Sequence, residues 1–331
     1  MIRHFLVDDD LSPAEQARVL DLAAQLKAAP YGVRSFAGPR CIAVMFDKPT
    51  LRTQSSFAAG IVELGGYPMM VDGRLAGIGE RESVADTARV LGRQADAIVW
   101  RTFAQSALAE MAEYSGVPTV NALTDSYHPC QILADLLTIR ERFGRVAGLR
   151  FAYVGDGANN MANSYLLGGA TAGLHVRIGA PAGFQPDPVI IGRAEVIAAQ
   201  TGGSVMITTS ASEAVAGCDV VATDTWVSMG QESTGRESIF VPYAVTTELF
   251  AQASPDAIAL HCLPAYRGKE IAAEVIDGPR SAVWDEAENR RHAQKAVLVF
   301  LEAASRGETL ASVTVRGADS AVPVDARRDD G

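Results

Sequence analysis

Short apolar runs recur along the chain and alternate with stretches of helical spacing. Seven runs have the length of strands buried on both faces, and we predict strands at residues 41–46, 97–100, 150–155, 174–180, 219–224, 257–262 and 282–286. Buried strands separated by helices are typical of parallel sheets with crossover helices. The pattern predicts an α/β fold with two similar parallel-sheet domains, helices on both faces of each sheet, and helices that link the domains.

Capping signals place several boundaries. Ser12, Pro13 and Glu15 form a capping box with proline in the first turn, which predicts a helix that begins there. A new strand is predicted from Arg150, after the helix that begins at Pro129, so we place a domain junction near residues 143–149. The segment 306–331 is rich in small and charged residues, and we predict a loosely attached tail.

The stretch VMFDKPTLRTQSSF, residues 44–57, turns from an apolar strand into a polar loop. Pro49 ends the strand, and a helix of regular spacing follows. Thr50, Arg52 and Thr53 therefore lie near a helix N-terminus, where free N–H groups and the helix dipole favour an anion. The residues fit a phosphate site, although an ordinary capped helix with a solvated arginine also explains them.

Composition limits the classes of function. A net charge of −10 argues against a nucleic-acid partner, while a local basic pocket for a small phosphate stays compatible with it. The four cysteines are far apart and form no C-x-x-C pair, which fits a reducing cytoplasm better than a disulfide framework or zinc site. The N-terminal MIRHFLVDDD lacks the apolar core of a signal peptide, and no run is long enough for a membrane span.

The segment YVGDGANNMANS, residues 153–164, follows a strand and opens a helix, as a dinucleotide fingerprint does. Two features argue against a nicotinamide-dependent dehydrogenase. Asn160 stands where the third glycine is expected, and the next strand ends without an acidic residue for a ribose. The paired amides of Asn159 and Asn160 can instead donate to a carboxylate, or cap the helix.

Three further strand or helix ends carry polar side chains. Asp224 follows a strand, at the edge where open α/β sheets bind ligands, and an acid there suits an amine. His261 and Cys262 end another strand, but neighbours in an extended chain point to opposite sides, which disfavours a nucleophilic pair. His128 and Gln131 stand at a helix start and can face an anion or a carbonyl.

Four motifs together resemble the aspartate/ornithine carbamoyltransferase family, and its ornithine branch in particular, over about residues 1–302. They are the S-T-R-T-type loop at Thr50–Thr53, H-P-x-Q at His128–Gln131, D-x-x-x-S-M-G at Asp224–Gly230 and H-C-L-P at His261–Pro264. The resemblance implies transfer of the carbamoyl group of carbamoyl phosphate to the side-chain amine of L-ornithine. The products are L-citrulline and phosphate, and neither a metal nor an organic cofactor is implied.

The resemblance also implies roles for individual residues and domains. Residues 1–146 would bind carbamoyl phosphate and residues 147–305 ornithine, within a homotrimer or a multiple of it. The implied carbamoyl phosphate ligands are Thr50, Leu51, Arg52, Thr53, Arg101, His128, Gln131, Cys262, Leu263 and Arg290. The implied ornithine ligands are Asn160, Asp224, Ser228 and Met229. The implied catalytic residues are Arg101, His128, Asp224, Cys262 and Arg290.

The chain departs from the family pattern at four places, Leu51, Gln54, Ile78 and Tyr266. Ile78 lies in a loop, residues 72–83, that in the family reaches the site of a neighbouring subunit with a polar side chain. These departures leave two alternatives to ornithine transfer. One is carbamoylation of a different diamino acid or amine in a specialised pathway, and the other is a catalytically weak paralogue that only binds ligands.

Overall fold

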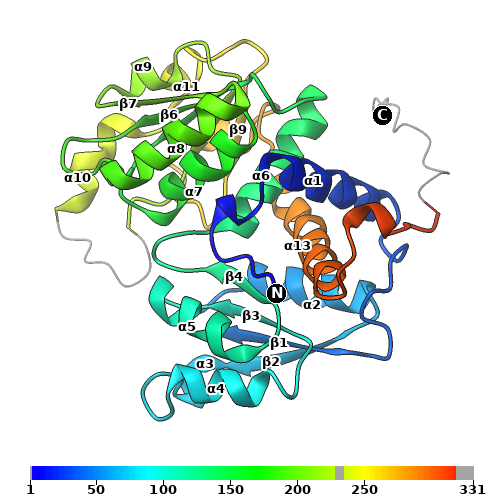
Figure 1. Cartoon of the computed structure of the whole chain (residues 1–331). Coiled ribbons are helices and arrows are strands. Elements are labelled where there is room, and N and C mark those ends of the chain that lie inside the picture. The colour runs from blue at the N-terminus through cyan, green and yellow to red at the C-terminus, as the bar shows by residue number, and fades with distance from the viewer. Residues whose placement is uncertain (1, 228–234, 318–331) are drawn as a thin grey trace.

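The computed structural model describes residues 2–227 and 235–317 of the chain. The described chain forms two parallel sheets with helices packed around them (Figure 1). The first sheet has the order β2-β1-β3-β4, with β1 (Cys41–Phe46), β2 (Tyr67–Asp72), β3 (Ala97–Arg101) and β4 (Thr119–Leu123). The second has the order β7-β6-β5-β8-β9, with β5 (Arg150–Val154), β6 (His175–Gly179), β7 (Ser204–Thr208), β8 (Val220–Thr223) and β9 (Ile258–His261). The predicted α/β class is confirmed.

Helices connect the strands and cover the sheets. Those up to the junction are α1 (Pro13–Ala28), α2 (Arg52–Glu63), α3 (Gly73–Ala76), α4 (Val84–Leu91), α5 (Gln105–Ser115) and α6 (Pro129–Phe143). Those beyond it are α7 (Asn160–Thr171), α8 (Pro188–Thr201), α9 (Ala211–Val215), α10 (Arg236–Phe240), α11 (Thr247–Phe250), α12 (Ala273–Ile276) and α13 (Val283–Ser305). Short 3-10 turns are η1 (Asp8–Asp10), η2 (Val241–Tyr243) and η3 (Leu310–Ser312). Within the described ranges, no helix is both long and apolar enough to cross a bilayer.

Local sequence signals explain several boundaries. The Ser12 hydroxyl accepts a hydrogen bond from the Glu15 amide at 3.3 Å, and the Glu15 carboxylate accepts one from the Ser12 amide at 2.9 Å, so the predicted capping box is confirmed. Strand β1 is buried at five of its six positions, as predicted for a strand covered on both faces. One predicted strand is wrong: residues 282–286 open helix α13, because Asp285 and Glu286 in the first turn favour a helix N-terminus.

The last helix, α13, belongs by sequence to the second half but packs on the first. The helix lies against α1, α2 and α6 (Figure 1). Its buried side chains join the same hydrophobic core as both sheets. Lys295 on α13 is fully buried, and its ammonium donates to the carbonyls of Leu26 and Pro30 and pairs with Glu63. Helices α6 and α13 therefore fix the position of one sheet relative to the other.

The chain after α13 returns to the start of the first half. We predicted a loosely attached tail over residues 306–331, and its part 318–331 lies outside the described residues. Residues 306–317 dock on the connection between α1 and β1. The Arg316 amide donates to the Gly32 carbonyl at 2.9 Å, and Val315 packs against the core. A Cβ on Gly32 would lie 2.6 Å from a methyl group of Val315, so glycine is needed at this crossing. The part of the tail that is described is thus held by backbone pairing and apolar contact.

Candidate active site

A cavity of about 440 Å³ lies where the carboxyl ends of the two sheets face each other. Its lining comes from the loops that follow β1, β3, β4, β5, β8 and β9, together with one side chain of α13. Loops at strand carboxyl ends are the usual binding loops of parallel α/β sheets, because every strand ends at the same edge. The four predicted motif loops therefore converge on one cavity.

Three guanidinium groups face this cavity. Arg52 opens α2, Arg101 ends β3, and Arg290 projects from α13. Arg52 donates to the Leu263 carbonyl at 2.7 Å, and Arg290 donates to the Thr53 hydroxyl at 2.8 Å. In the described part of the chain, no carboxylate lies within 4.0 Å of any of the three. This wall of the cavity therefore carries positive charge that no carboxylate among the described residues contacts.

Burial is the strongest influence on the pKa values of Arg101 and Arg290. It lowers the pKa of Arg101 to about 10, and the nearby positive charge of Arg290 adds to the effect. Burial also lowers the pKa of Arg290. Arg101 still remains protonated at neutral pH, because a pKa of about 10 leaves nearly all of a group charged there. Buried cations without counter-ions attract an anionic ligand strongly.

His128 sits beside the arginines at the start of α6. Its backbone amide donates to the Ser164 hydroxyl at 2.9 Å, and its side chain is 3% exposed. Burial and the positive charges of Arg290, Arg101 and Arg52 hold the pKa of His128 well below its ordinary value. The imidazole is therefore neutral at neutral pH and can hydrogen-bond a carbonyl oxygen without bringing another charge.

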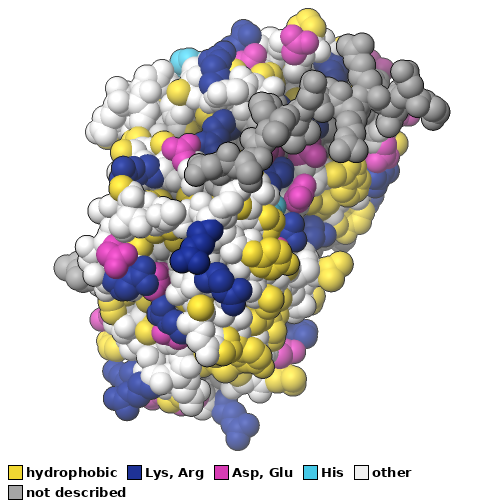
Figure 2. All heavy atoms as spheres, turned by 90° about the vertical axis from the view of Figure 1, so that its right-hand side faces the viewer, with side chains coloured by type: hydrophobic (Ala, Val, Ile, Leu, Met, Phe, Trp, Pro, Cys, Tyr) yellow, Lys and Arg dark blue, Asp and Glu magenta, His cyan; other side chains and the backbone are white. Residues whose placement is uncertain are grey.

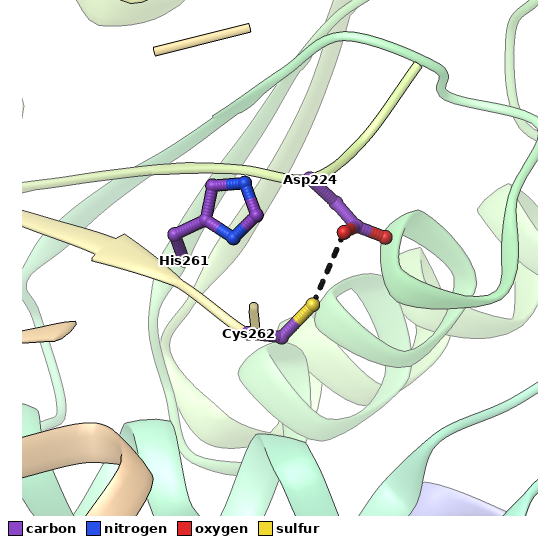
Figure 3. A group of neighbouring side chains, drawn as sticks. All are labelled: Asp224, His261 and Cys262. Carbon is purple, nitrogen blue, oxygen red and sulfur yellow. Dashed lines mark hydrogen bonds between the residues drawn. The ribbon is translucent and has the colours of Figure 1, made fainter. Parts of the chain in front are cut away.

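The opposite wall carries Asp224 at the end of β8 and Cys262 directly after β9. The thiol of Cys262 donates to Asp224 Oδ1 at 3.2 Å, and the Thr225 amide donates to the same oxygen at 2.7 Å (Figure 3). Burial, followed by the negative charge of Asp224, raises the pKa of the Cys262 thiol well above its ordinary value. The Cys262 thiol is therefore neutral at neutral pH and acts as a hydrogen-bond donor. A nucleophilic cysteine must be a thiolate, so Cys262 is not a nucleophile here.

His261 does not act on Cys262, as the sequence indicated. Its Nδ1 accepts a hydrogen bond from the Leu263 amide at 2.9 Å, and its Nε2 lies 3.2 Å from a carboxylate oxygen of Glu270. The ligand atoms of Asp224, His261 and Cys262 lie within 4.8 Å of one another (Figure 3). Because both ring nitrogens and the thiol already have protein partners, we assign no metal to this cluster.

Leu263 has unusual backbone geometry. Its φ of 58° lies in the left-handed region, and no other non-glycine residue in the described ranges has a positive φ. This conformation costs a branched aliphatic residue free energy, so the surrounding contacts must stabilise it. The Leu263 amide bonds His261, and its carbonyl accepts from Arg52. The bond between Arg52 and Leu263 thereby links the start of α2 in the first half to the loop after β9 in the second.

The remaining predicted ligands differ in whether they line the cavity. Thr50 lines the cavity, and so does Asn160, whose amide donates to the Thr124 carbonyl at 2.7 Å. The cavity is not lined by Leu51, Thr53 or Gln131. The Leu51 side chain is 76% exposed, Thr53 is buried behind Arg290, and Gln131 is fully buried beneath the cavity floor. The predicted positions Ser228 and Met229 lie outside the described residues.

The departures from the family pattern also have definite places. Tyr266 lines the cavity and is half exposed, whereas Gln54 lines a separate recess of about 280 Å³ beside β2. Ile78 packs against the core cluster of α4 and α5, so its side chain has contacts within its own chain. Lys48, which the sequence did not assign a role, lines both cavities and pairs with Asp125. The position of Lys48, just after a buried strand, is the sequence signal that could have identified it as a cavity residue.

Comparisons with known proteins agree with this geometry. Residues 3–141 match the carbamoyl-phosphate-binding domain of aspartate/ornithine carbamoyltransferases, and residues 147–301 match their aspartate/ornithine-binding domain. An ornithine carbamoyltransferase of Clavibacter sepedonicus is 62% identical over 303 residues, which are 91% of this chain and 99% of the relative.

Solved structures give the same result. An ornithine carbamoyltransferase from Pyrococcus furiosus has a TM-score of 0.87 and 38% identity, over 94% of this chain and 98% of its own. An anabolic ornithine carbamoyltransferase from Campylobacter jejuni has a TM-score of 0.87 and 35% identity, over 92% of this chain and all of its own. The chain belongs to the aspartate/ornithine carbamoyltransferase family.

Proposed function

We propose that this protein is an ornithine carbamoyltransferase, which forms L-citrulline and phosphate from carbamoyl phosphate and L-ornithine. The observation that carries the proposal is the pairing of opposite walls in one cavity. One wall holds three guanidinium groups that have no carboxylate partner in residues 2–227 and 235–317, and the other holds Asp224. A dianionic phosphate fits the first wall and a cationic amino acid the second. The names of the relatives described above support the same reaction.

Carbamoyl phosphate would bind at the first wall. Arg52 and the hydroxyl of Thr50 lie at the start of α2, where amide N–H groups and the helix dipole add to the attraction for phosphate. The predicted ligands Leu51 and Thr53 would act there through their backbone, since their side chains point elsewhere. To take the phosphate, Arg52 exchanges the Leu263 carbonyl for phosphate oxygens, which frees that carbonyl for the amino group of the carbamoyl moiety.

Arg101, His128 and Arg290 would serve the reacting carbonyl. When the amine attacks, a C–N bond forms and negative charge develops on the carbonyl oxygen. Preorganised donors placed at such an oxygen typically lower the barrier more than any other single effect. Collapse of the intermediate then breaks the C–O bond to phosphate, and the arginines hold the departing dianion. The neutral imidazole of His128 donates one hydrogen bond without repelling the guanidinium groups.

Ornithine would bind with its side-chain amine near Asp224 and Cys262. An unperturbed alkyl ammonium has a pKa near 10.4, so the amine must lose a proton before it attacks. Asp224 can orient the ammonium, and the phosphate of the other substrate can accept the proton, since it becomes more basic as it leaves. Asn160 would bind the amino-acid end, together with Ser228 and Met229, which lie outside the described residues. Residues 1–146 would thus serve carbamoyl phosphate and residues 147–305 ornithine.

We expect purified protein to form citrulline from carbamoyl phosphate and ornithine in a colorimetric ureido assay. Lysine, putrescine and diaminobutyrate, tested in parallel at equal concentrations, measure the choice of acceptor. A higher kcat/KM with another amine than with ornithine would identify a different acceptor. Absence of a ureido product with every amine would mean that the protein only binds its ligands.

The first half also carries an apolar surface. It includes the large hydrophobic side chains of Leu51, Val62, Tyr67, Met70 and Leu75, which are between 44% and 84% exposed. They lie on or beside α2, α3 and the edge strand β2. Figure 2 shows hydrophobic side chains gathered on the lower half of the displayed face, the half that contains the first sheet in Figure 1. Exposed apolar patches of this kind mark subunit interfaces. We infer that this surface joins the subunits of a homotrimer or a multiple of it.

We expect the wild type to have the mass of a trimer, or of a multiple of it, in light scattering. The double variant Val62→Glu/Met70→Glu should dissociate to monomers, because buried unpaired carboxylates oppose association. Val189→Glu/Val196→Glu on α8 is the matched control, since these valines are 77% and 61% exposed in the other half. A fully active wild-type monomer, or dissociation by the control alone, would refute the assignment of the surface.

The four cysteines are all unpaired in the structure. Unpaired cysteines are typical of a reducing compartment, and we propose that the enzyme works in the cytoplasm. The likeness to an anabolic enzyme from Campylobacter jejuni supports a role in arginine biosynthesis.

A further inference from the structure

Two buried carboxyl groups lie beneath the cavity floor, between α6 and α13. Asp135 is 0% exposed and Glu286 is 1% exposed. In residues 2–227 and 235–317, no arginine, lysine or histidine nitrogen lies within 4.0 Å of either carboxyl group. Gln131, which is equally buried, stands between them and has a side-chain oxygen without a partner. Burying two carboxyl groups and an amide costs free energy unless they hydrogen-bond one another or their neighbours.

The two carboxyl groups accept four hydrogen bonds from three donor groups. The Gln131 amide donates to Asp135 Oδ1 at 2.8 Å and to Glu286 Oε1 at 2.7 Å. The Tyr165 hydroxyl donates to Asp135 Oδ2 at 2.7 Å, and the backbone amide of His261 donates to Glu286 Oε2 at 2.9 Å. A single nitrogen of Gln131 thus bridges the two carboxyl groups, which therefore lie next to each other. Glu286 therefore touches an active-site helix of one half and the last residue of a strand of the other.

The carboxyl pair holds one proton. Two adjacent carboxylates in a dry site cannot both be ionised, since each would repel the other. Each carboxyl group accepts two hydrogen bonds, Asp135 from Gln131 and Tyr165 and Glu286 from Gln131 and the His261 amide. Burial raises the pKa of Asp135 to about 6, while burial followed by the charge of Asp135 raises that of Glu286 well above its ordinary range.

We propose that Glu286 is a positioning residue that acts as a neutral acid: it donates to Asp135 and holds Gln131 and the His261 amide in fixed places. Gln131 lies one turn after His128 on α6, and His261 leads directly into Cys262 and Leu263. Arg290 stands one turn after Glu286 on α13. Glu286 thus fixes the carbamoyl phosphate side of the cavity relative to the amine side, a role that rests on the proposed function.

Three variants test this role. Glu286→Gln keeps the shape and a donor to Asp135, and should retain kcat within about tenfold, the value of one lost hydrogen bond. Glu286→Leu removes every contact and should lower kcat by about a hundredfold or more. Asp135→Asn should be at least about tenfold worse than Glu286→Gln, because an amide cannot accept from all three donors that surround Asp135. A pair without a preferred proton site would tolerate either amide equally.

The matched control is Leu298→Ala, a 1% exposed residue of the same helix that faces the core. It should lower the thermal midpoint as Glu286→Leu does, yet keep kcat within about twofold, because its cavity lies away from the site. Equal kcat for Glu286→Leu and this control, at equal stability, would overturn the proposal. Equal impairment by Glu286→Gln and Glu286→Leu would also overturn it.

Hydrogen exchange gives a readout that needs no turnover. The amides of residues 257–263 should exchange at least about tenfold faster in Glu286→Leu than in Glu286→Gln or Leu298→Ala, because only the leucine leaves the His261 amide without an acceptor. If the wild type makes no citrulline, the proposed function fails and this measurement alone decides the role of Glu286. Unchanged exchange in Glu286→Leu would overturn the role whether or not the enzyme is active.

Discussion

Arg101→Met should lower kcat/KM for carbamoyl phosphate by about a thousandfold or more, the largest loss that we expect from one substitution. The side chain is 8% exposed, lies in the cavity and has no carboxylate partner among the described residues. Its loss removes a buried charge from the phosphate and from the developing oxyanion, and one oxyanion donor alone is worth about 10²–10³ in rate. The measurement is initial velocity against carbamoyl phosphate concentration at saturating ornithine.

Two further variants make that result specific. Arg101→Lys keeps the charge but loses the planar fork, so it should fall between the wild type and Arg101→Met. Arg89→Met is the control, because Arg89 is an exposed residue of α4 that pairs with Asp86 and should change the rate by less than about twofold. If Arg101→Met and Arg89→Met behaved alike, the guanidinium of Arg101 would have no part in catalysis.

Asp224→Asn should raise KM for ornithine by about ten- to a hundredfold and change KM for carbamoyl phosphate by less than about threefold. Asp224 is 8% exposed on the wall opposite the arginines, and a hydrogen bond to a charged group is worth about 1.5–3 kcal/mol. The amide still accepts from Thr225 and Cys262 but can no longer pair with an ammonium. Two-substrate initial-rate kinetics separate the two KM values.

The control for this change is Asp277→Asn, which removes a carboxylate of similar kind that pairs with Arg267 on the surface. It should leave both KM values as they are, because exposed ion pairs contribute little. An equal rise of both KM values in Asp224→Asn would contradict the division of the cavity into a phosphate wall and an amine wall.

The sequence located the binding loops because each one follows a buried apolar strand. Arg52, Asp224 and Cys262 all stand at such ends, and the parallel arrangement brings those ends to one cavity. Strands β2, β4 and β7 were not predicted. They carry polar residues or proline within short runs, as in Pro68 of β2, which an edge strand tolerates. Short mixed runs carry too weak a periodic signal for a strand to be predicted.

A linear motif does not predict the direction in which a side chain points. Thr53 and Gln131 stand in the right motifs, yet one supports Arg290 and the other bonds two buried carboxyl groups. Which face of a helix meets the ligand depends on packing between segments far apart in the chain. Glu286 shows the same limit, because residues 282–286 read as a strand and its partners are 25 and 155 positions away.

The packing of α13 on α1, α2 and α6 has a consequence for how the polypeptide folds during synthesis. The first half is complete in sequence when α6 ends at Phe143, but the helix that covers its core begins only at Val283. At 5–20 residues per second, the ribosome needs roughly 7–28 s to make the 140 residues between these points. Throughout that interval the apolar faces of α1 and α2 lack their partner. The nascent first half therefore exposes apolar surface, which favours aggregation, until translation is nearly finished.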